Sequence, residues 1–165
     1  MAYGRYKQNK PLPPCYDKAL DLLARRAHSR AELEHKLRER GYAEDELQDT
    51  LERLCAAHLI DDAAYAEHMA ERLARTKGFA PRRIALELRR RGVGDEELSA
   101  ALEPLETQDA RESIRAMLEK KFARDLDSEK GRRRAVNALV RMGYSWGDIR
   151  SAMREYDSTE ENYYD

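Results

Sequence analysis

The chain has 165 residues and a net charge of only −1, although 38% of its residues are charged. This balance excludes a simple polycation that would coat nucleic acid through net charge alone, so the distribution of charge matters more than its sum. No apolar run approaches the ~18 residues that span a bilayer, and the first residues lack the apolar core of a secretory signal. We expect a cytoplasmic protein without a membrane segment, with reduced thiols at Cys15 and Cys55.

The predicted elements, in chain order, form three groups of three helices. Ala, Leu, Glu and Arg dominate the composition, and no alternating β-branched run predicts a strand. We expect the first helix of each group at 16–27, 62–76 and 107–122, with a longer connection at 123–131 in the third group. The predicted divisions are a flexible, basic, proline-rich segment at 1–15, three-helix repeats at 16–60, 61–106 and 107–156, and an acidic tail at 157–165.

The two later helices of each group are predicted from three glycines, Gly41, Gly92 and Gly143, which are 51 residues apart. Apolar residues stand eight and four positions before each glycine, and six and ten positions after it. This spacing places them on one face of a helix on each side, with the glycine ending the first helix in the left-handed region. A helix pair of this size has too little core to be stable alone, so neighbouring repeats must stack.

Start signals agree with these helices. Ser29 followed by Glu32 matches a capping box, and Pro81 fits a first helical position. Asp95 is a candidate N-cap for the helix after Gly92, and the pair Asp61–Asp62 is better explained as a cap than as a metal or acid–base dyad.

Eight basic residues lie between positions 72 and 91, where only Glu87 opposes them, and seven more lie between 120 and 134, whereas 93–109 is acidic and holds no base. Ile84 and Leu88 should face the core, so the arginines around them cover the outer face of their helix. Such a face suits DNA phosphates, an acidic protein surface, or solvent alone. The candidate binding residues are Arg72, Arg75, Lys77, Arg82, Arg83, Arg89, Arg90, Arg91, Lys120, Lys121, Arg124, Lys130, Arg132, Arg133 and Arg134.

No catalytic motif is present. The sequence has no P-loop, GxGxxG or HExxH, and we predict no catalytic residue, cofactor or metal site. The four histidines show no metal pair and are expected at the surface: His28, His35, His58 and His68. Trp146 is expected to pack between helices and Cys55 to lie in the core. A helix-turn-helix is the rival interpretation of each helix pair, but three uneven basic copies favour an extended surface.

The middle repeat resembles the RecX family of regulatory proteins. The run HLIDDAAYAEHMAERLARTKGFAPRRIALELRRRGV, residues 58–93, is similar to the family's central signature. HSRAELEHKLRERGY and EKGRRRAVNALVRMGYSWGDI resemble its opening and closing helix pairs, so the resemblance covers about 17–156. His58 and Leu59 replace a usual glycine and tyrosine, which suggests a different turn there. Ala64 replaces a common arginine and Ala80 a common glycine.

The resemblance implies an elongated, curved array of three-helix repeats that acts as a non-enzymatic modulator of the RecA recombinase. A monomer is expected to bind the RecA–single-stranded DNA filament and to inhibit ATP hydrolysis, strand exchange and coprotease activity, thereby modulating recombination, DNA repair and the SOS response. Two alternatives stay open. One is a sequence-nonspecific single-stranded DNA-binding protein without RecA contact, and the other is an adaptor whose basic surface meets an acidic protein.

Overall fold

The computed structural model describes residues 12–161, with side chains described for 12–158. Within these residues the protein has nine α-helices and no strand, which confirms the predicted all-α class. None of the described helices is both long and apolar enough to cross a membrane. The chain divides into two compact units, with the boundary between Asp61 and Asp62, and each is described by itself.

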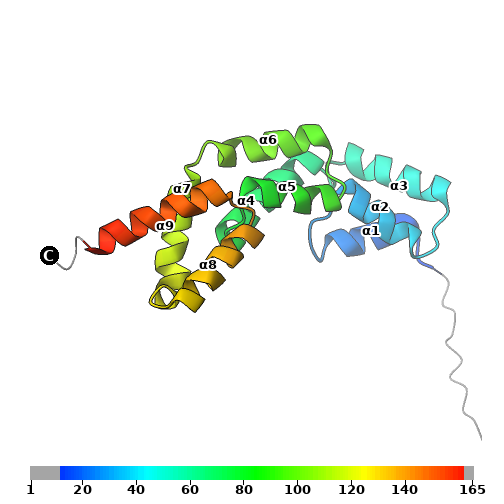
Figure 1. Ribbon diagram of the computed structural model, residues 1–165. Helices are drawn as coiled ribbons and strands as arrows, with labels where there is room; N and C mark the ends of the chain where they lie inside the picture. The colour runs from blue at the N-terminus through cyan, green and yellow to red at the C-terminus, as the bar shows by residue number, and fades with distance from the viewer. Residues whose placement is uncertain (1–11, 162–165) are drawn as a thin grey trace, which may run out of the picture. The chain divides into compact units, whose positions relative to one another are not determined.

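Unit 1 contains one group of three helices around one hydrophobic cluster (Figure 1). The leucines of the two later helices are fully buried, as the glycine register predicts. The first helix ends earlier than predicted, because residues 24–27 form the connection that leads into Ser29, the N-cap of the next helix. The helices are α1 (Cys15–Leu23), α2 (Arg30–Arg38) and α3 (Glu44–Ala56).

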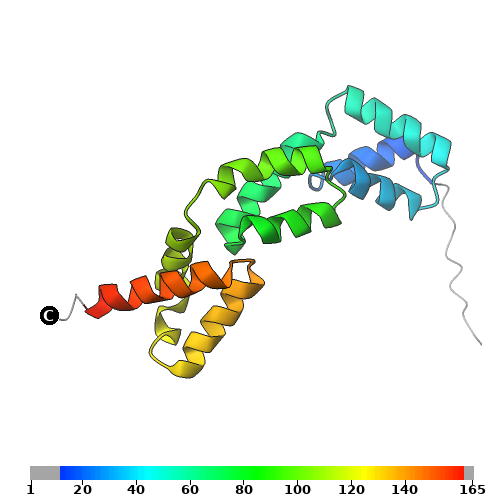
Figure 2. The same ribbon diagram turned by 45° about the horizontal axis from the view of Figure 1, so that its top comes forward.

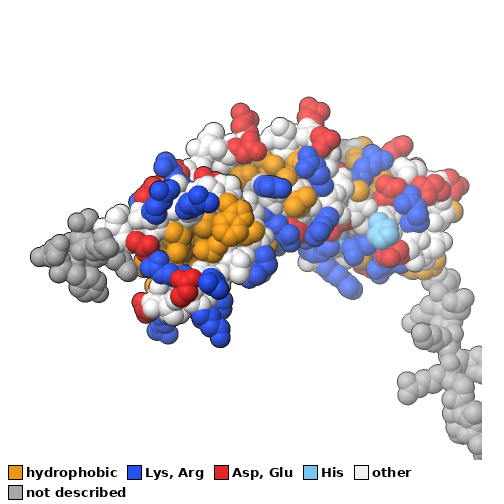
Figure 3. All heavy atoms as spheres, in the orientation of Figure 1, with side chains coloured by type: hydrophobic (Ala, Val, Ile, Leu, Met, Phe, Trp, Pro, Cys, Tyr) orange, Lys and Arg blue, Asp and Glu red, His pale blue; other side chains and the backbone are white. Residues whose placement is uncertain are grey.

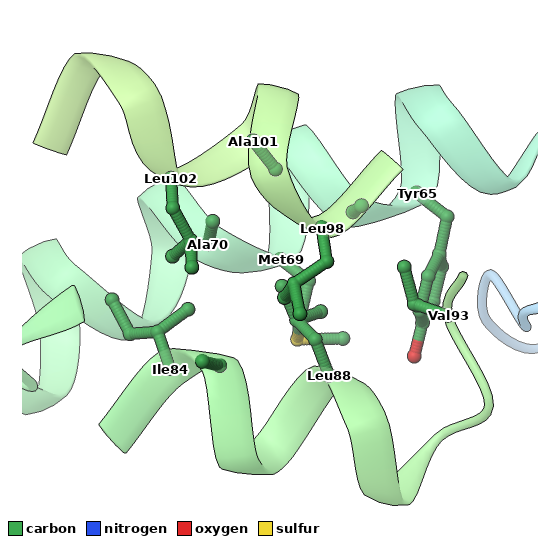
Figure 4. Close-up of a cluster of buried hydrophobic side chains, with 11 residues drawn as sticks. Tyr65, Met69, Ala70, Ile84, Leu88, Val93, Leu98, Ala101 and Leu102 are labelled. Carbon is green, nitrogen blue, oxygen red and sulfur yellow. The ribbon is translucent and has the colours of Figure 1, made fainter. Parts of the chain in front are cut away.

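Unit 2 contains the second and third groups of helices, each around its own cluster (Figures 1 and 2). In the second group, Ile84 and Leu88 point from one helix toward Met69 and Leu98 on the other two (Figure 4). The helices of this group are α4 (Asp62–Lys77), α5 (Pro81–Arg90) and α6 (Asp95–Glu106). Those of the third are α7 (Ala110–Met117), α8 (Glu129–Arg141) and α9 (Trp146–Glu161).

The third group departs from the other two at both of its ends. Its predicted first helix, 107–122, begins at Ala110 after an Asp109 cap and continues as a π-helical turn, Leu118–Phe122, and a 3₁₀ turn, Ala123–Asp125. At the other end, α9 includes 157–161, the first residues of the predicted acidic tail. The rest of that tail and residues 1–11 of the predicted flexible segment lie outside the described residues.

The three glycines end their helices as predicted. Gly41, Gly92 and Gly143 have φ values of 89°, 73° and 97°, the left-handed region that only glycine enters without a Cβ clash. The residue after the glycine closes the turn in the second and third groups, because the amides of Val93 and Tyr144 donate to Leu88 and Leu139. These are Schellman-type ends, which satisfy carbonyls that the helix leaves open.

Within unit 2, the glycine turn of the third group also packs against the second group. The Ala80 amide donates to the Met142 carbonyl over 2.9 Å. A Cβ added to Gly143 would lie 2.7 Å from the Arg83 Cβ, and one added to Gly78 would lie 2.6 Å from the Met117 sulfur. The two groups are therefore held together by close backbone contact as well as by side chains.

Three predictions for single residues are wrong. His28 is buried, with 5% of its surface exposed, because the connection between α1 and α2 folds onto the core of unit 1. Trp146 is 58% exposed, although it is the first residue of α9 and lies only three residues before the buried Ile149. Asp95 is the first residue of α6, and Gly94 occupies the cap position.

The turn at His58 is the same kind as the glycine turns, so the different turn suggested by the sequence is not formed. His58 has φ 53°, and it is the one non-glycine residue in the described part of the chain with a positive φ. The amides of His58 and Leu59 donate to Cys55 and Leu54, each over 2.9 Å. A histidine in this conformation carries a Cβ clash that glycine lacks.

We expect His58→Gly to raise the free energy of unfolding of unit 1 by about 1 kcal/mol, because glycine removes that clash. Urea denaturation followed by circular dichroism would measure the gain. Ala57→Gly is the matched control, since Ala57 has φ −85° and gains no relief. Equal effects of the two substitutions would contradict strain at His58.

His28 should make unit 1 less stable in acid. Burial lowers the pKa of His28 below its usual 6.5, and nearby Arg26 adds to this effect, while Glu32 opposes it. The folded state therefore favours neutral His28, so the stabilisation is fully present above pH 6.5 and is lost as pH falls toward the lowered pKa. Urea midpoints at pH 7.5 and 5.5 should differ less in His28→Gln than in the wild type. An unchanged difference would contradict the assignment.

Candidate nucleic-acid and partner interface

The basic face of α5 is built on two buried residues. Ile84 and Leu88 are fully buried one turn apart, so the positions on the opposite side of the helix face outward. Arg82, Arg89 and Arg90 are exposed on that outer side. Arg82 makes no ion pair within the described residues, whereas Arg89 lies 3.5 Å from Asp95 and Arg90 lies 3.8 Å from Glu87. Exposed pairs at such distances are weak and leave the guanidinium available to a ligand.

Two of the predicted residues, Arg83 on this helix and Arg91 at its C-cap, are part of the packing instead. Arg83 donates to Glu87 over 2.7 Å, and its guanidinium lies 5.4 Å from the Phe79 ring centre. Gly143 packs against the Arg83 backbone. Arg91 donates to the Tyr65 hydroxyl over 3.3 Å. Both arginines are half-buried, so replacing them would disturb the fold as well as any binding.

The basic residues of the third group divide in the same way. Arg132 makes a bidentate pair with Asp157, at 2.8 and 3.1 Å, and also donates to the Leu126 carbonyl. Arg134 donates to Asp125 over 2.6 Å, and Arg133 pairs with Glu129. In contrast, four exposed cations have no ion pair within the described part of the chain: Lys120, Lys121, Arg124 and Lys130.

A cleft of about 580 Å³ brings together predicted residues from both groups of unit 2. Arg75 lines it from α4, and Lys120 and Lys121 line it from the π-helical turn. Phe79 and Tyr144 supply aromatic surface, and burial raises the pKa of Tyr144 above its usual 10, so this phenol stays neutral. Glu71 and Glu106 offset part of the positive charge. The cleft is cationic on one wall and apolar within.

The remaining predicted residues lie on α4. Arg72 is exposed and donates toward the Met69 sulfur over 3.0 Å, and Lys77 is the exposed last residue of the helix. Lys and Arg side chains gather over α5 and α8, whereas Asp and Glu stand out along α6 (Figure 3). The described surface of unit 2 is therefore segregated by charge, as the sequence indicates.

Four exposed side chains in the third group were not among the predicted binding residues: Trp146, Arg141, Arg150 and Arg154. None of the three arginines has an ion pair within the described residues. A signal was present in the sequence, because 146, 150 and 154 are four apart and share one face of a helix. The described residues contain no group of His, Cys, Asp and Glu side chains that could hold a metal ion.

Comparisons with known proteins place these features in a family. The family models described as the first and second three-helix domains of RecX match residues 15–54 and 61–102. A regulatory protein RecX of Xanthomonas axonopodis pv. citri (strain 306) is 36% identical over 153 residues, which cover 91% of this chain and 90% of the relative. That of Mycolicibacterium smegmatis (strain ATCC 700084 / mc(2)155) is 39% identical over 132 residues, which cover 76% and 70%.

Solved structures agree with the family comparison. The crystal structure of RecX from Lactobacillus salivarius matches with a TM-score of 0.72 and 26% identity, over 87% of this chain and 94% of that one. The match extends beyond the segments covered by the two family models, which end at residue 102.

Proposed function

This chain belongs to the RecX family of regulatory proteins, and on that premise we propose that it regulates the RecA recombinase without catalysing a reaction of its own. It binds the RecA–single-stranded DNA filament and inhibits ATP hydrolysis, strand exchange and coprotease activity. Through this inhibition it modulates recombination, DNA repair and the SOS response. It acts in the cytoplasm as a monomer.

The observation that carries this proposal is a set of exposed cations without an ion pair among the described residues, on a unit that also bears an acidic helix. Arg82 on α5 and the lysines at the cleft are available to bind DNA phosphates, and the release of counterions from the DNA adds to the affinity. The first turn of α6 presents three carboxylates. A filament of protein and DNA offers both charges, so a surface with separate patches of each sign fits it better than it fits naked DNA.

ATP hydrolysis by RecA on single-stranded DNA, measured while this protein is titrated in, tests the proposal. Binding to naked DNA is measured at the same salt concentration, because affinities for DNA change steeply with salt. We expect inhibition well below one molecule per RecA, because a molecule bound in the filament affects several subunits, together with weak binding to naked DNA.

Unchanged hydrolysis would overturn the RecA proposal. The DNA measurement would then choose between the two alternatives. Strong, salt-sensitive binding would indicate a single-stranded DNA-binding protein, and no binding would indicate an adaptor for an acidic protein.

A further inference from the structure

The outer face of α9 carries one aromatic side chain and two arginines in a row. Trp146, Arg150 and Arg154 are spaced four residues apart, so they lie along one side of the helix at steps of about 6 Å. All three are exposed, whereas Ile149, Ala152 and Tyr156 on the other side are buried. We call these three exposed residues the α9 stripe.

Trp146 has no structural role that explains its exposure. It makes no hydrogen bond or cation–π contact within the described part of the chain, and it is the only tryptophan in the sequence. Its position is nevertheless well fixed, because the Asp148 amide donates to the Ser145 hydroxyl over 3.1 Å and that hydroxyl donates to the Asp148 carboxylate over 2.6 Å. The indole therefore sits on a capped, ordered helix end. Hydrophobic side chains gather where α8 leads into α9, with Lys and Arg around them (Figure 3).

Within the described residues, the carboxylates near the two arginines of the stripe contact other basic side chains. Glu155 lies 3.6 Å from Arg111 and 3.9 Å from Arg115 on α7, and Asp157 holds Arg132 on α8. Arg150 and Arg154 have no ion pair within the described residues. What distinguishes them from other exposed arginines of unit 2, such as Arg82 and Arg124, is that they continue the line of an exposed aromatic side chain.

We propose that the α9 stripe binds a single-stranded nucleic acid, with one unpaired base stacked on the indole of Trp146 and adjacent phosphates bound by Arg150 and Arg154. An aromatic platform beside a cationic track is the combination that holds single strands without sequence preference. Arginine binds phosphate oxygens through its planar fork, which fits the neighbouring cations. This inference rests on the proposed function and deepens it, since it names the part of the protein that contacts the single-stranded DNA.

The sole tryptophan makes the stacking step directly observable in the full-length protein. Titration with an oligo(dT) strand at low salt should quench the Trp146 fluorescence, whereas an abasic strand of the same length should not, because it offers phosphates and no base. Anisotropy of a labelled oligo(dT) gives the affinity of variants. Trp146→Ala should weaken binding about tenfold and Trp146→Phe much less, because base–aromatic stacking tolerates a smaller ring.

The arginines have a separate readout. Arg150→Ala with Arg154→Ala should flatten the plot of log affinity against log salt by about 1.4, which corresponds to two phosphate contacts on a single strand. Leu59→Ala is the control for Trp146→Ala, because it removes an exposed apolar side chain outside the stripe. It should leave both the affinity for oligo(dT) and the salt slope unchanged.

Three outcomes would overturn the inference: no quenching by oligo(dT), equal quenching by the abasic strand, or full oligo(dT) affinity in Trp146→Ala. If Trp146→Ala keeps that affinity but no longer inhibits RecA, the stripe is a protein contact and the inference is wrong while the proposed function stands. If stacking is observed but the wild type does not inhibit RecA, the inference stands and the proposed function fails.

Discussion

Gly131→Ala is expected to destabilise the third group of helices by about 3 kcal/mol or more. Gly131 is a buried residue of α8, and an added Cβ would overlap the carbonyl oxygen of Asp125 and lie 2.7 Å from its carbon. The obstacle is backbone, so no side-chain rotation relieves it. Asp125 is also held in place, because its carboxylate accepts from Arg134. The chain must therefore open the connection between the 3₁₀ turn and α8.

Urea denaturation followed by circular dichroism, with limited proteolysis to locate the loss, measures this effect. Gly41→Ala is the matched control. Its Cβ meets nothing within 4 Å, so only its φ of 89° opposes the change, and a cost of about 1 kcal/mol is expected. Cleavage in Gly131→Ala should begin in α7–α9. If Gly131→Ala were as stable as Gly41→Ala, the connection before α8 would be able to move away from the added Cβ, and the prediction would be wrong.

The repeat period explains both what could be predicted from the sequence and why Gly131 was missed. Positions 29, 80 and 131 are separated by the same 51 residues, and all three hold small buried residues. In the first two groups this position is the N-cap of a helix. In the third, α8 begins three residues earlier than the register implies, so Gly131 lies inside the helix and against the preceding turn. The small size of Gly131 therefore follows the 51-residue period, whereas its contact with the preceding turn is found in the third group alone.

Core positions were predictable because burial on a helix depends on local spacing. Leu37, Leu88 and Leu139 are fully buried, as their common distance from the glycines requires. The pairing of charges was not predictable, because it depends on where distant segments meet. Arg132 and Asp157 are 25 residues apart, and only the packing of α9 on the third group brings them together. Local spacing did not decide the exposure of Trp146 either, because this residue lies only three positions before the buried Ile149.

The candidate interface was predicted residue by residue, and the structure divides that set into exposed cations and cations that take part in packing. The α5 face and the lysines of the π-helical turn are exposed and available. The i,i+4 spacing of Arg83 and Glu87 indicates their ion pair, but the local sequence does not show that the Gly143 turn packs against Arg83. Charge patterns show where cations are concentrated, whereas tertiary contacts decide which of them serve the fold.

Reversing three exposed arginines of α5, Arg82→Glu with Arg89→Glu and Arg90→Glu, is expected to raise the concentration needed for half-inhibition of RecA ATP hydrolysis tenfold to a hundredfold. Each exposed contact is worth roughly 0.5–1 kcal/mol, so three lost contacts give about 1.5–3 kcal/mol, and the new repulsion adds to this loss. Arg83 is left unchanged, because it pairs with Glu87 on the same helix and packs against Gly143 of the third group.

The control variant must change the net charge by the same amount, because general repulsion from the filament weakens the binding of any more acidic variant. Arg25→Glu with Arg40→Glu and Arg53→Glu meets this requirement with three exposed arginines of unit 1. Both triple variants are first checked for wild-type helicity and urea midpoints within about 1–2 kcal/mol, since exposed charges contribute little to folding. A large loss of RecA inhibition in the α5 variant, with a small loss in the control variant, would assign the effect to α5. Equal losses would mean that net charge alone governs inhibition, and full inhibition by a folded α5 variant would remove this helix from the interface.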